Sequence, residues 1–191
     1  MEFTPIQNKI IQVYDNIVPN YISNQIHDLT LGDVNNFSWS YSPSLTYPST
    51  HPKYKFKPGL KHSVYNKGAN HYSNFLFLLS QPLYAFCLKT GFELQTILRI
   101  DSFLDLPNPN PGPDLPAHID RDIPHYVLLY YINNSDGDTI LFEGDEKTEL
   151  KRVSPKQGRA IFFDGSIPHC GSTSGVSSRA VINFNFLGRQ Q

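Results

Sequence analysis

The chain has 191 residues, of which 39% are hydrophobic and 17% are charged, and its formal net charge is −1. This length and composition suit one globular domain with a buried core, so we expect residues 1–191 to fold as a single domain. A net charge so close to zero provides no global field that would recruit nucleic acid or a membrane surface.

The compartment is predicted from the absence of several signals. No apolar run is as long as a membrane span, and residues 1–5 lack the basic-then-apolar layout of a signal peptide. Cys87 and Cys170 are the only cysteines, which is too few for a disulfide framework. We therefore expect a cytoplasmic, monomeric protein that does not bind membranes.

Residues 1–93 show a mixed pattern that predicts a supporting region of helices and strands. Residues 10–18 are predicted to form a strand, and a helix is expected to begin at Pro19 because apolar residues then recur at helical spacing. A further helix is expected to start or kink at Pro82 and to end at Gly91. We expect these helices to form a layer on the outside of a sheet.

Lysine and aromatic residues alternate between residues 51 and 72. The lysines are Lys53, Lys55, Lys57, Lys61 and Lys67. We interpret the segment as a solvated basic loop, since loops commonly carry charge. The alternatives are a lid that steers an acidic substrate and a surface for single-stranded nucleic acid, which basic and aromatic side chains together would bind. Nucleic acid therefore stays among the candidate partners.

Residues 94–188 alternate short apolar segments with turn signals, and this pattern predicts the core of the domain. Eight segments at fairly even spacing favour a two-sheet jelly roll, or double-stranded β-helix, over a parallel βαβ sheet. The expected class is mainly β, with the N-terminal helices packed on one sheet. The predicted segments are 94–103, 118–120, 125–133, 139–142, 149–153, 160–164, 167–171 and 179–187.

The last predicted strand has two different faces. Its even-numbered residues from 180 to 186 are all apolar, so this face is predicted to pack against the helices. Its odd-numbered residues then line the interior and include Arg179 and Asn183. The same alternation on strand 125–133 favours Tyr131 over Tyr130 as the interior tyrosine.

His118 and Asp120 form a candidate metal site together with His169. Residues two apart in a strand point to the same face, so His118 and Asp120 are expected to project together. Two imidazoles and one carboxylate are the ligand set of non-haem Fe(II) oxygenases, which leaves coordination positions open. Arg179 supplies the interior cation that a dicarboxylate cosubstrate would need.

Two other interpretations of these residues compete with the iron site. His169 and Cys170 could belong to a zinc site, but the only other cysteine is Cys87 and no C-x-x-C motif is present. A cupin-like metal-binding module without catalysis is the second alternative. Arg179 argues against it, because a bare metal-binding module has no use for an interior cation.

A set of motifs in residues 94–188 resembles the Fe(II)/2-oxoglutarate-dependent oxygenases. Within these it is most similar to the prolyl 4-hydroxylase-like branch and its small microbial and viral relatives. The motifs are HID at 118–120, YYIN at 130–133, DGDTILF at 136–142, FDGSIPHCGS at 163–172, and Arg179.

The resemblance implies a site for Fe(II) and for 2-oxoglutarate. Iron would be held by His118, Asp120 and His169, and the far carboxylate of 2-oxoglutarate would meet Arg179 and Tyr131. Relatives often carry a tyrosine on the strand before the H-x-D motif, where this chain offers Arg99, Asp101 and Phe103.

The activity implied by the resemblance is dioxygenase chemistry. With O2 and 2-oxoglutarate, such an enzyme hydroxylates an unactivated C–H bond and releases succinate and CO2. A protein or peptide is the expected substrate, as for prolyl hydroxylases, and a small molecule or nucleic acid is the alternative. Candidates for substrate contact or for the rim of the site are Arg99, Arg121, Tyr130 and Asn183.

Overall fold

The computed structural model describes residues 10–33, 37–43, 45, 58–110, 117–144 and 147–190. Its helices are α1 (Asn20–Leu31), α2 (Leu76–Leu79) and α3 (Gln81–Thr90). Its strands are β1 (Ile11–Tyr14), β2 (Ser40–Ser42), β3 (Gly59–Asn66), β4 (His71–Tyr72), β5 (Glu93–Asp105), β6 (Tyr126–Tyr131), β7 (Thr139–Phe142), β8 (Glu149–Val153), β9 (Ala160–Asp164), β10 (His169–Gly171) and β11 (Arg179–Arg189).

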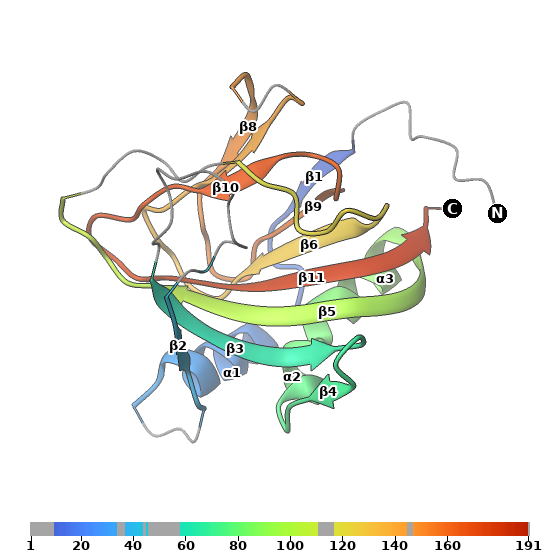
Figure 1. The fold of residues 1–191 in the computed structure, drawn as a ribbon. Helices are drawn as coiled ribbons and strands as arrows, with labels where there is room; N and C mark the ends of the chain where they lie inside the picture. The colour runs from blue at the N-terminus through green and yellow to red at the C-terminus, as the bar shows by residue number, and fades with distance from the viewer. Residues whose placement is uncertain are drawn as a thin grey trace.

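Two antiparallel sheets of unequal size form the centre of the molecule (Figure 1). The larger sheet has the strand order β1-β9-β6-β11-β5-β3-β2, with β4 paired to β3, and the smaller sheet has the order β10-β7-β8. The long strands β5 and β11 pair along most of their length at the middle of the larger sheet. This arrangement confirms the predicted two-sheet jelly roll with a mainly β composition.

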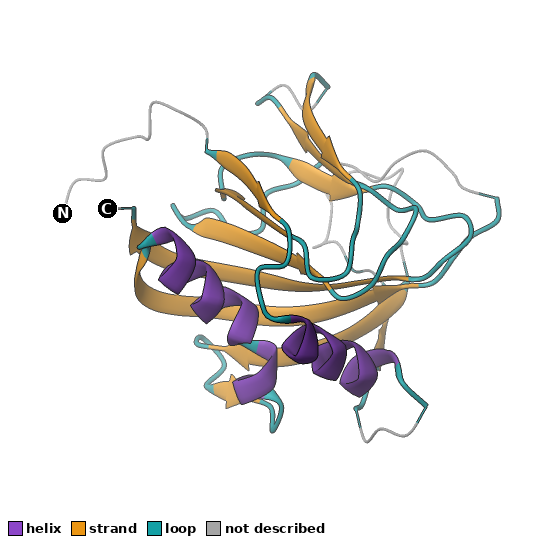
Figure 2. Cartoon of the chain, turned by 180° about the vertical axis from the view of Figure 1, so that it is seen from behind, coloured by secondary structure: helices purple, strands orange, loops and turns teal. Residues whose placement is uncertain are grey.

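The three helices cover one face of the larger sheet (Figure 2). Their contacts with the sheet are apolar and largely aromatic: the Phe86 and Phe162 rings lie 4.6 Å apart between centroids. On β11, the even-numbered residues Ala180, Ile182, Phe184 and Phe186 belong to this core, as the alternation predicts. Since each fully buried aromatic side chain removes a large apolar area from water, the packing of this layer stabilises the fold.

The predicted helix ends are confirmed at proline and glycine. Pro19 immediately precedes α1, and Pro82 lies in the first turn of α3, where its missing N–H costs no hydrogen bond. Gly91 ends α3 in the left-handed conformation with φ of 72°, which a residue with a side chain rarely adopts. Among the described residues, no helix is both long and apolar enough to cross a lipid bilayer.

The structure corrects two predictions of local structure. Residues 59–66 were predicted as part of a basic loop or lid, but they form β3, which pairs with β5 next to the interior. Residues 118–120 were predicted as a short strand, but only His118 makes a bridge, to His169 of β10. Lys53, Lys55 and Lys57 lie outside the described residues.

A second, smaller core lies between the two sheets. It contains Leu129 and Tyr131 of β6, Val181 of β11 and Leu141 of β7. The odd-numbered residues of β6 and β11 therefore face the interior, as the alternation predicts. At one end of this core the interior becomes polar, and the candidate site is found there.

Candidate metal centre and cosubstrate pocket

The structure brings His118, Asp120 and His169 together at the edge of the interior. One ligand atom from each of the three side chains lies within 4.8 Å of the others. The backbones of His118 and His169 exchange two hydrogen bonds of 3.0 and 2.9 Å, which align the two histidines side by side. Two nitrogens and one oxygen at this spacing fit a single divalent ion of the kind that non-haem iron oxygenases bind.

The ring of His169 is oriented for metal binding. Its Nδ1 lies 3.1 Å from the carbonyl oxygen of Ile167, which can only accept, so Nδ1 carries the proton and Nε2 offers its lone pair. Nε2 lies 3.9 Å from Asp120 Oδ2. Burial lowers the pKa of His169 to about 4, so the imidazole is neutral at neutral pH, as a metal ligand must be.

The carboxylate of Asp120 is held by three side chains of the larger sheet. Arg99 Nη2 donates to Oδ1 at 3.1 Å, while the Nδ2 atoms of Asn183 and Asn185 donate to Oδ2 at 2.9 and 2.8 Å. Burial alone would raise the pKa of Asp120. The charge of Arg99, joined in the acid range where this carboxyl titrates by that of protonated His169, outweighs burial and holds the pKa well below its usual range. Asp120 is therefore ionised and fixed in one orientation.

These contacts follow from the register of β5 against β11. On the interior face, polar side chains of one strand lie directly opposite polar side chains of the other. The opposed pairs are Arg179 with Asp105, Asn183 with Asp101, and Asn185 with Arg99. Arg99 also contacts Asp101, with Nε 3.3 Å from Oδ2, and Lys61 of β3 reaches the same oxygen at 2.8 Å.

Arg179 is buried at the opposite end of this row. Its Nε donates to the carbonyl oxygen of Gly137 at 2.9 Å, and its Nη2 donates to Thr139 Oγ1 at 2.7 Å. Its Nη1 lies 3.4 Å from Asp105 Oδ2. The guanidinium is thus held in place by contacts along its edges.

Tyr131 lies beside Arg179, as the sequence predicts. Its ring centroid is 5.8 Å from the Arg179 guanidinium carbon, and its hydroxyl lies 2.7 Å from Thr139 Oγ1. Burial raises the pKa of Tyr131 to about 12, so the phenol keeps its proton and acts as a hydrogen-bond donor. Tyr131 and Arg179 therefore share the hydroxyl of Thr139.

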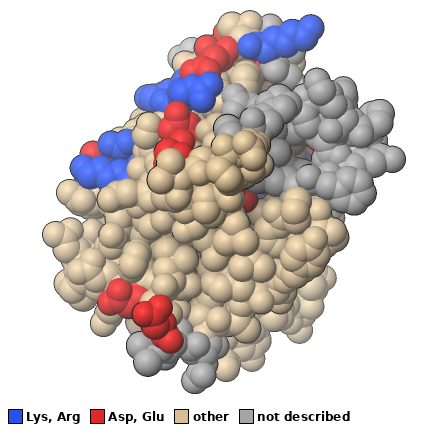
Figure 3. All heavy atoms as spheres, turned by 90° about the vertical axis from the view of Figure 1, so that its left-hand side faces the viewer, with Lys and Arg blue, Asp and Glu red and all other residues tan. Residues whose placement is uncertain are grey.

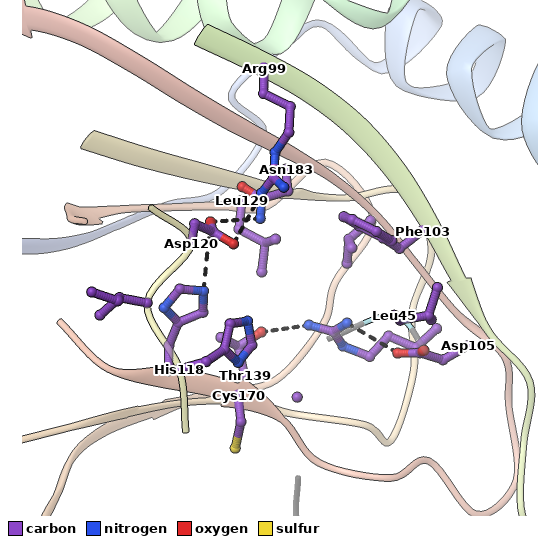
Figure 4. A pocket seen from close by; sticks show the side chains of 15 residues that line it. Leu45, Arg99, Phe103, Asp105, His118, Asp120, Leu129, Thr139, Cys170 and Asn183 are labelled. Atoms are coloured by element: carbon purple, nitrogen blue, oxygen red, sulfur yellow. Dashed lines mark hydrogen bonds and ion pairs between the residues drawn. The ribbon is translucent and has the colours of Figure 1, made fainter. Parts of the chain in front are cut away.

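One cavity of about 100 Å³ connects the two ends of the site. Figure 4 shows Asp120 and His118 at one end and Asp105 at the other, with Phe103 and Leu129 between them. Arg99, Thr139, Arg179 and Asn183 also line the cavity. The three candidate metal-ligating side chains and a buried guanidinium therefore face the same small space.

The face of the molecule drawn in Figure 3 has no dominant charge among the described residues. Acidic and basic side chains alternate near its upper edge, acidic side chains lie near its lower edge, and most of the remaining described surface is uncharged. On β8, Arg152 and Glu149 form an ion pair of 2.9 Å.

The predicted rim residues have different positions in the structure. Arg99 and Asn183 line the cavity, but both bind Asp120. The prediction that Tyr130 contributes to the rim is wrong. Tyr130 faces the helical layer, where its hydroxyl donates to Ser23 Oγ of α1 at 3.0 Å. Arg121 follows Asp120 in a partly exposed position outside the cavity lining, and its contact with substrate stays a prediction.

Sequence reasoning missed three residues of the site. Asp105 was missed because the predicted strand ended at residue 103, whereas β5 continues to Asp105. Asn185 was assigned to the correct face without a role, and Thr139 was assigned only to a strand. Strand alternation from Arg99 onward would have found Asp105, since residues 99, 101, 103 and 105 share one face.

A scan against models of protein families finds no match for this sequence, and a search among curated proteins finds none either. Solved structures do match. A prolyl 4-hydroxylase from Pseudomonas putida is similar with a TM-score of 0.55 and 15% identity, over 94% of this chain and 92% of that one.

Two further solved structures extend this likeness. A prolyl hydroxylase from Trichoplax adhaerens, in complex with a peptide fragment of the hypoxia-inducible factor oxygen degradation domain, matches with a TM-score of 0.59 and 14% identity, over 92% of this chain and 83% of that one. HygX from Streptomyces hygroscopicus, with nickel and 2-oxoglutarate bound, matches with a TM-score of 0.55 and 12% identity, over 93% and 82%. The chain therefore has the fold of the prolyl hydroxylase-like 2-oxoglutarate oxygenases.

Proposed function

We propose that this protein is a non-haem Fe(II)- and 2-oxoglutarate-dependent dioxygenase that hydroxylates an unactivated C–H bond. One observation carries the proposal. His118, Asp120 and His169 converge at one end of a cavity whose other end contains the buried cation Arg179. A 2-oxo acid with a second carboxylate is the ligand that needs both ends, and the fold is that of enzymes that use it.

The three ligand side chains would hold Fe(II), and their state suits that role. His169 is neutral, and the carbonyl oxygen of Ile167 orients its ring. Asp120 is ionised and fixed by hydrogen bonds. Bound iron would supply the coupled oxidation of 2-oxoglutarate and of a substrate C–H bond by O2, with release of succinate and CO2.

The remaining cavity residues would orient the cosubstrate. Arg179 would pair with its far carboxylate, a bidentate geometry that guanidinium groups favour. Tyr131 and Thr139 keep the guanidinium in place through their shared hydrogen bond. Phe103 and Leu129 line the middle of the cavity and would exclude water from the bound chain of carbon atoms.

A protein or peptide, hydroxylated as by prolyl hydroxylases, is the proposed substrate. The likeness to two prolyl hydroxylase structures supports this choice, and the second of them was solved with a peptide. Ile119 and Ile123 next to the metal ligands are 40% and 48% exposed, which gives the neighbourhood of the site apolar contacts for a substrate side chain. We further propose that the protein acts as a monomer in the cytoplasm.

The first experiment tests the cosubstrate chemistry without O2. Anaerobic protein with Fe(II) and 2-oxoglutarate should develop a weak visible charge-transfer band, which His118→Ala should remove. His27→Ala is the matched control, because His27 lies on α1 away from the cavity, and it should keep the band. Absence of the band in the wild-type protein would favour the cupin-like alternative, a metal-binding module without catalysis.

The second experiment addresses the substrate. The protein is incubated aerobically with Fe(II), 2-oxoglutarate and proline-containing peptide pools, and succinate is followed above the uncoupled background. Mass spectrometry should detect a peptide that has gained one oxygen atom. If the charge-transfer band is present and no peptide pool stimulates succinate release, the substrate belongs to another chemical class.

A further inference from the structure

Asp105 places a second carboxylate in the part of the cavity where the cosubstrate carboxylate would bind. It is the last residue of β5, lies directly opposite Arg179 in the register with β11, and has a side chain only 8% exposed. Its Oδ2 lies 3.4 Å from Arg179 Nη1. Asp105 lines the same cavity as the metal ligands, at the end away from them (Figure 4).

Among the described contacts of Arg179, Asp105 provides the only negative charge. Gly137 and Thr139 accept hydrogen bonds from the guanidinium through neutral oxygens. An arginine carries five N–H donors, so these three partners leave donors for a further carboxylate. Asp105 therefore neutralises the charge of Arg179 without using all of its hydrogen-bonding capacity.

We propose that Asp105 sets the affinity of the pocket for the far carboxylate of the 2-oxo acid by competing for Arg179. The inference rests on the proposed function and concerns the same cavity. A cosubstrate carboxylate that approaches Arg179 meets a guanidinium that is already partly neutralised, and also meets the charge of Asp105 in a buried place where charges are weakly screened. Asp105 therefore weakens the binding of 2-oxoglutarate.

A purely structural role of Asp105 makes the opposite prediction. If Asp105 served only to orient Arg179, its neutralisation would loosen the guanidinium and weaken 2-oxoglutarate binding. If Asp105 competes, its neutralisation leaves Arg179 as a buried cation with no charged partner among the described residues, and such a cation binds an added carboxylate more tightly. The sign of the change in affinity distinguishes the two roles.

The experiment measures binding to the full chain loaded with Mn(II), by calorimetric titration. We expect Asp105→Asn to lower the dissociation constant for 2-oxoglutarate about tenfold, a change of about 1.4 kcal/mol. The matched control is Asp15→Asn, which also removes a carboxylate from an arginine, Arg159, but outside the cavity lining. This control should leave the dissociation constant within about threefold of the wild-type value.

A second ligand isolates the far carboxylate. 2-Oxopentanoate has the same carbon chain and metal-chelating end but lacks that carboxylate, so Asp105→Asn should not tighten its binding. The melting temperature of the metal-loaded variant should fall without ligand and rise further with 2-oxoglutarate than that of the wild type, because ligand binding stabilises the folded state. Asp105→Ser serves as a second neutral variant if the asparagine variant does not fold.

The outcomes separate this inference from the proposed function. Unchanged or weaker binding of 2-oxoglutarate by both neutral variants would overturn the role of Asp105 and leave the oxygenase proposal standing. Equal tightening by Asp15→Asn would also overturn it, because the effect would then come from the net charge of the protein and not from the contact with Arg179. If the wild-type protein with Mn(II) bound neither 2-oxo acid, both proposals would fail.

Discussion

The two faces of the larger sheet are built from the same strands but have opposite chemical character. The face under the helices is apolar, and its rings from α3, β9 and β11 pack within 6.4 Å of one another. The interior face of the neighbouring strands β5 and β11 carries charged and amide side chains in opposed pairs. Successive residues of one strand therefore lie alternately in an apolar core and in a polar interior.

β11 shows this division most clearly. Phe184 is fully buried among apolar side chains of the helical layer, whereas Asn185 is fully buried beside Asp120 and Arg99. A buried amide is tolerated only when its hydrogen bonds are made, and here they are made to Arg99 and to the proposed metal ligand Asp120. We therefore expect neighbouring substitutions on β11 to change stability and metal binding separately.

The largest expected effect is on the helix-covered face. Phe184→Ala should lower the free energy of unfolding by about 3–5 kcal/mol, because it removes a fully buried ring and leaves a cavity. Urea denaturation followed by circular dichroism measures this loss. The dissociation constant for Mn(II), determined at a temperature where the variant is folded, should stay within about twofold of the wild-type value, since Phe184 points away from the ligands.

Asn185→Leu on the interior face should show the reverse behaviour. This substitution keeps the volume but removes a hydrogen bond to Asp120 and the acceptor for Arg99, so the dissociation constant for Mn(II) should rise about tenfold. Phe184→Leu is the neighbouring control and should leave metal binding unchanged. Equal metal affinities for Asn185→Leu and the wild-type protein would show that the amide contacts do not position Asp120.

Much of this arrangement could be predicted because it depends on strand alternation. The period of two along 179–187 assigned Arg179 to the interior and Phe184 to the helical layer, and the structure confirms both positions. The same alternation, applied to 118–120, brought His118 and Asp120 together, although only His118 is bridged to a neighbouring strand. Local periodicity determines which face a side chain occupies, independently of the partner strand.

The missed features depend on long-range pairing. Asp105 opposes Arg179 only because β5 pairs with β11 in one particular register across 74 residues of sequence. Residues 59–66 form a strand because β5 offers a partner edge, although Lys61 and the neighbouring residues resemble a basic loop in isolation. Pairing between distant strands cannot be inferred from local composition, so tertiary context decided these positions.

A smaller effect is expected from the two adjacent tyrosines of β6. Tyr130 lies on the helix-covered face and Tyr131 on the interior face, so removing one hydroxyl from each compares the two faces. Tyr130→Phe loses the buried bond to Ser23 and should cost about 1 kcal/mol of unfolding free energy, without changing 2-oxoglutarate binding. Tyr131→Phe removes the partner of Thr139 beside Arg179 and should raise the dissociation constant for 2-oxoglutarate by about fivefold. Calorimetry and urea denaturation on both variants would reveal any exchange of these roles.

The smallest effect is expected outside both faces, at the turn that leads into Arg179. The Asp136 carboxylate accepts hydrogen bonds from the backbone N–H groups of Ser177, Gly175 and Val176, and these hold its pKa well below the usual range. A lowered pKa in the folded state means that this carboxylate stabilises the fold at pH values above its unfolded pKa of about 3.9. The contribution is lost as the pH falls below that value toward the folded pKa.

Asp136→Asn should therefore lower the melting temperature at pH 7 by no more than about 2 °C, because the site is solvent-exposed and well screened. The difference from the wild-type protein should shrink as the pH is lowered from 5 to 3. Faster amide hydrogen exchange at residues 175–177 of the variant would show that the turn itself has loosened. A difference in melting temperature that stays constant over this pH range would mean that the carboxylate charge does not hold the turn, and that Arg179 is positioned by the two sheets alone.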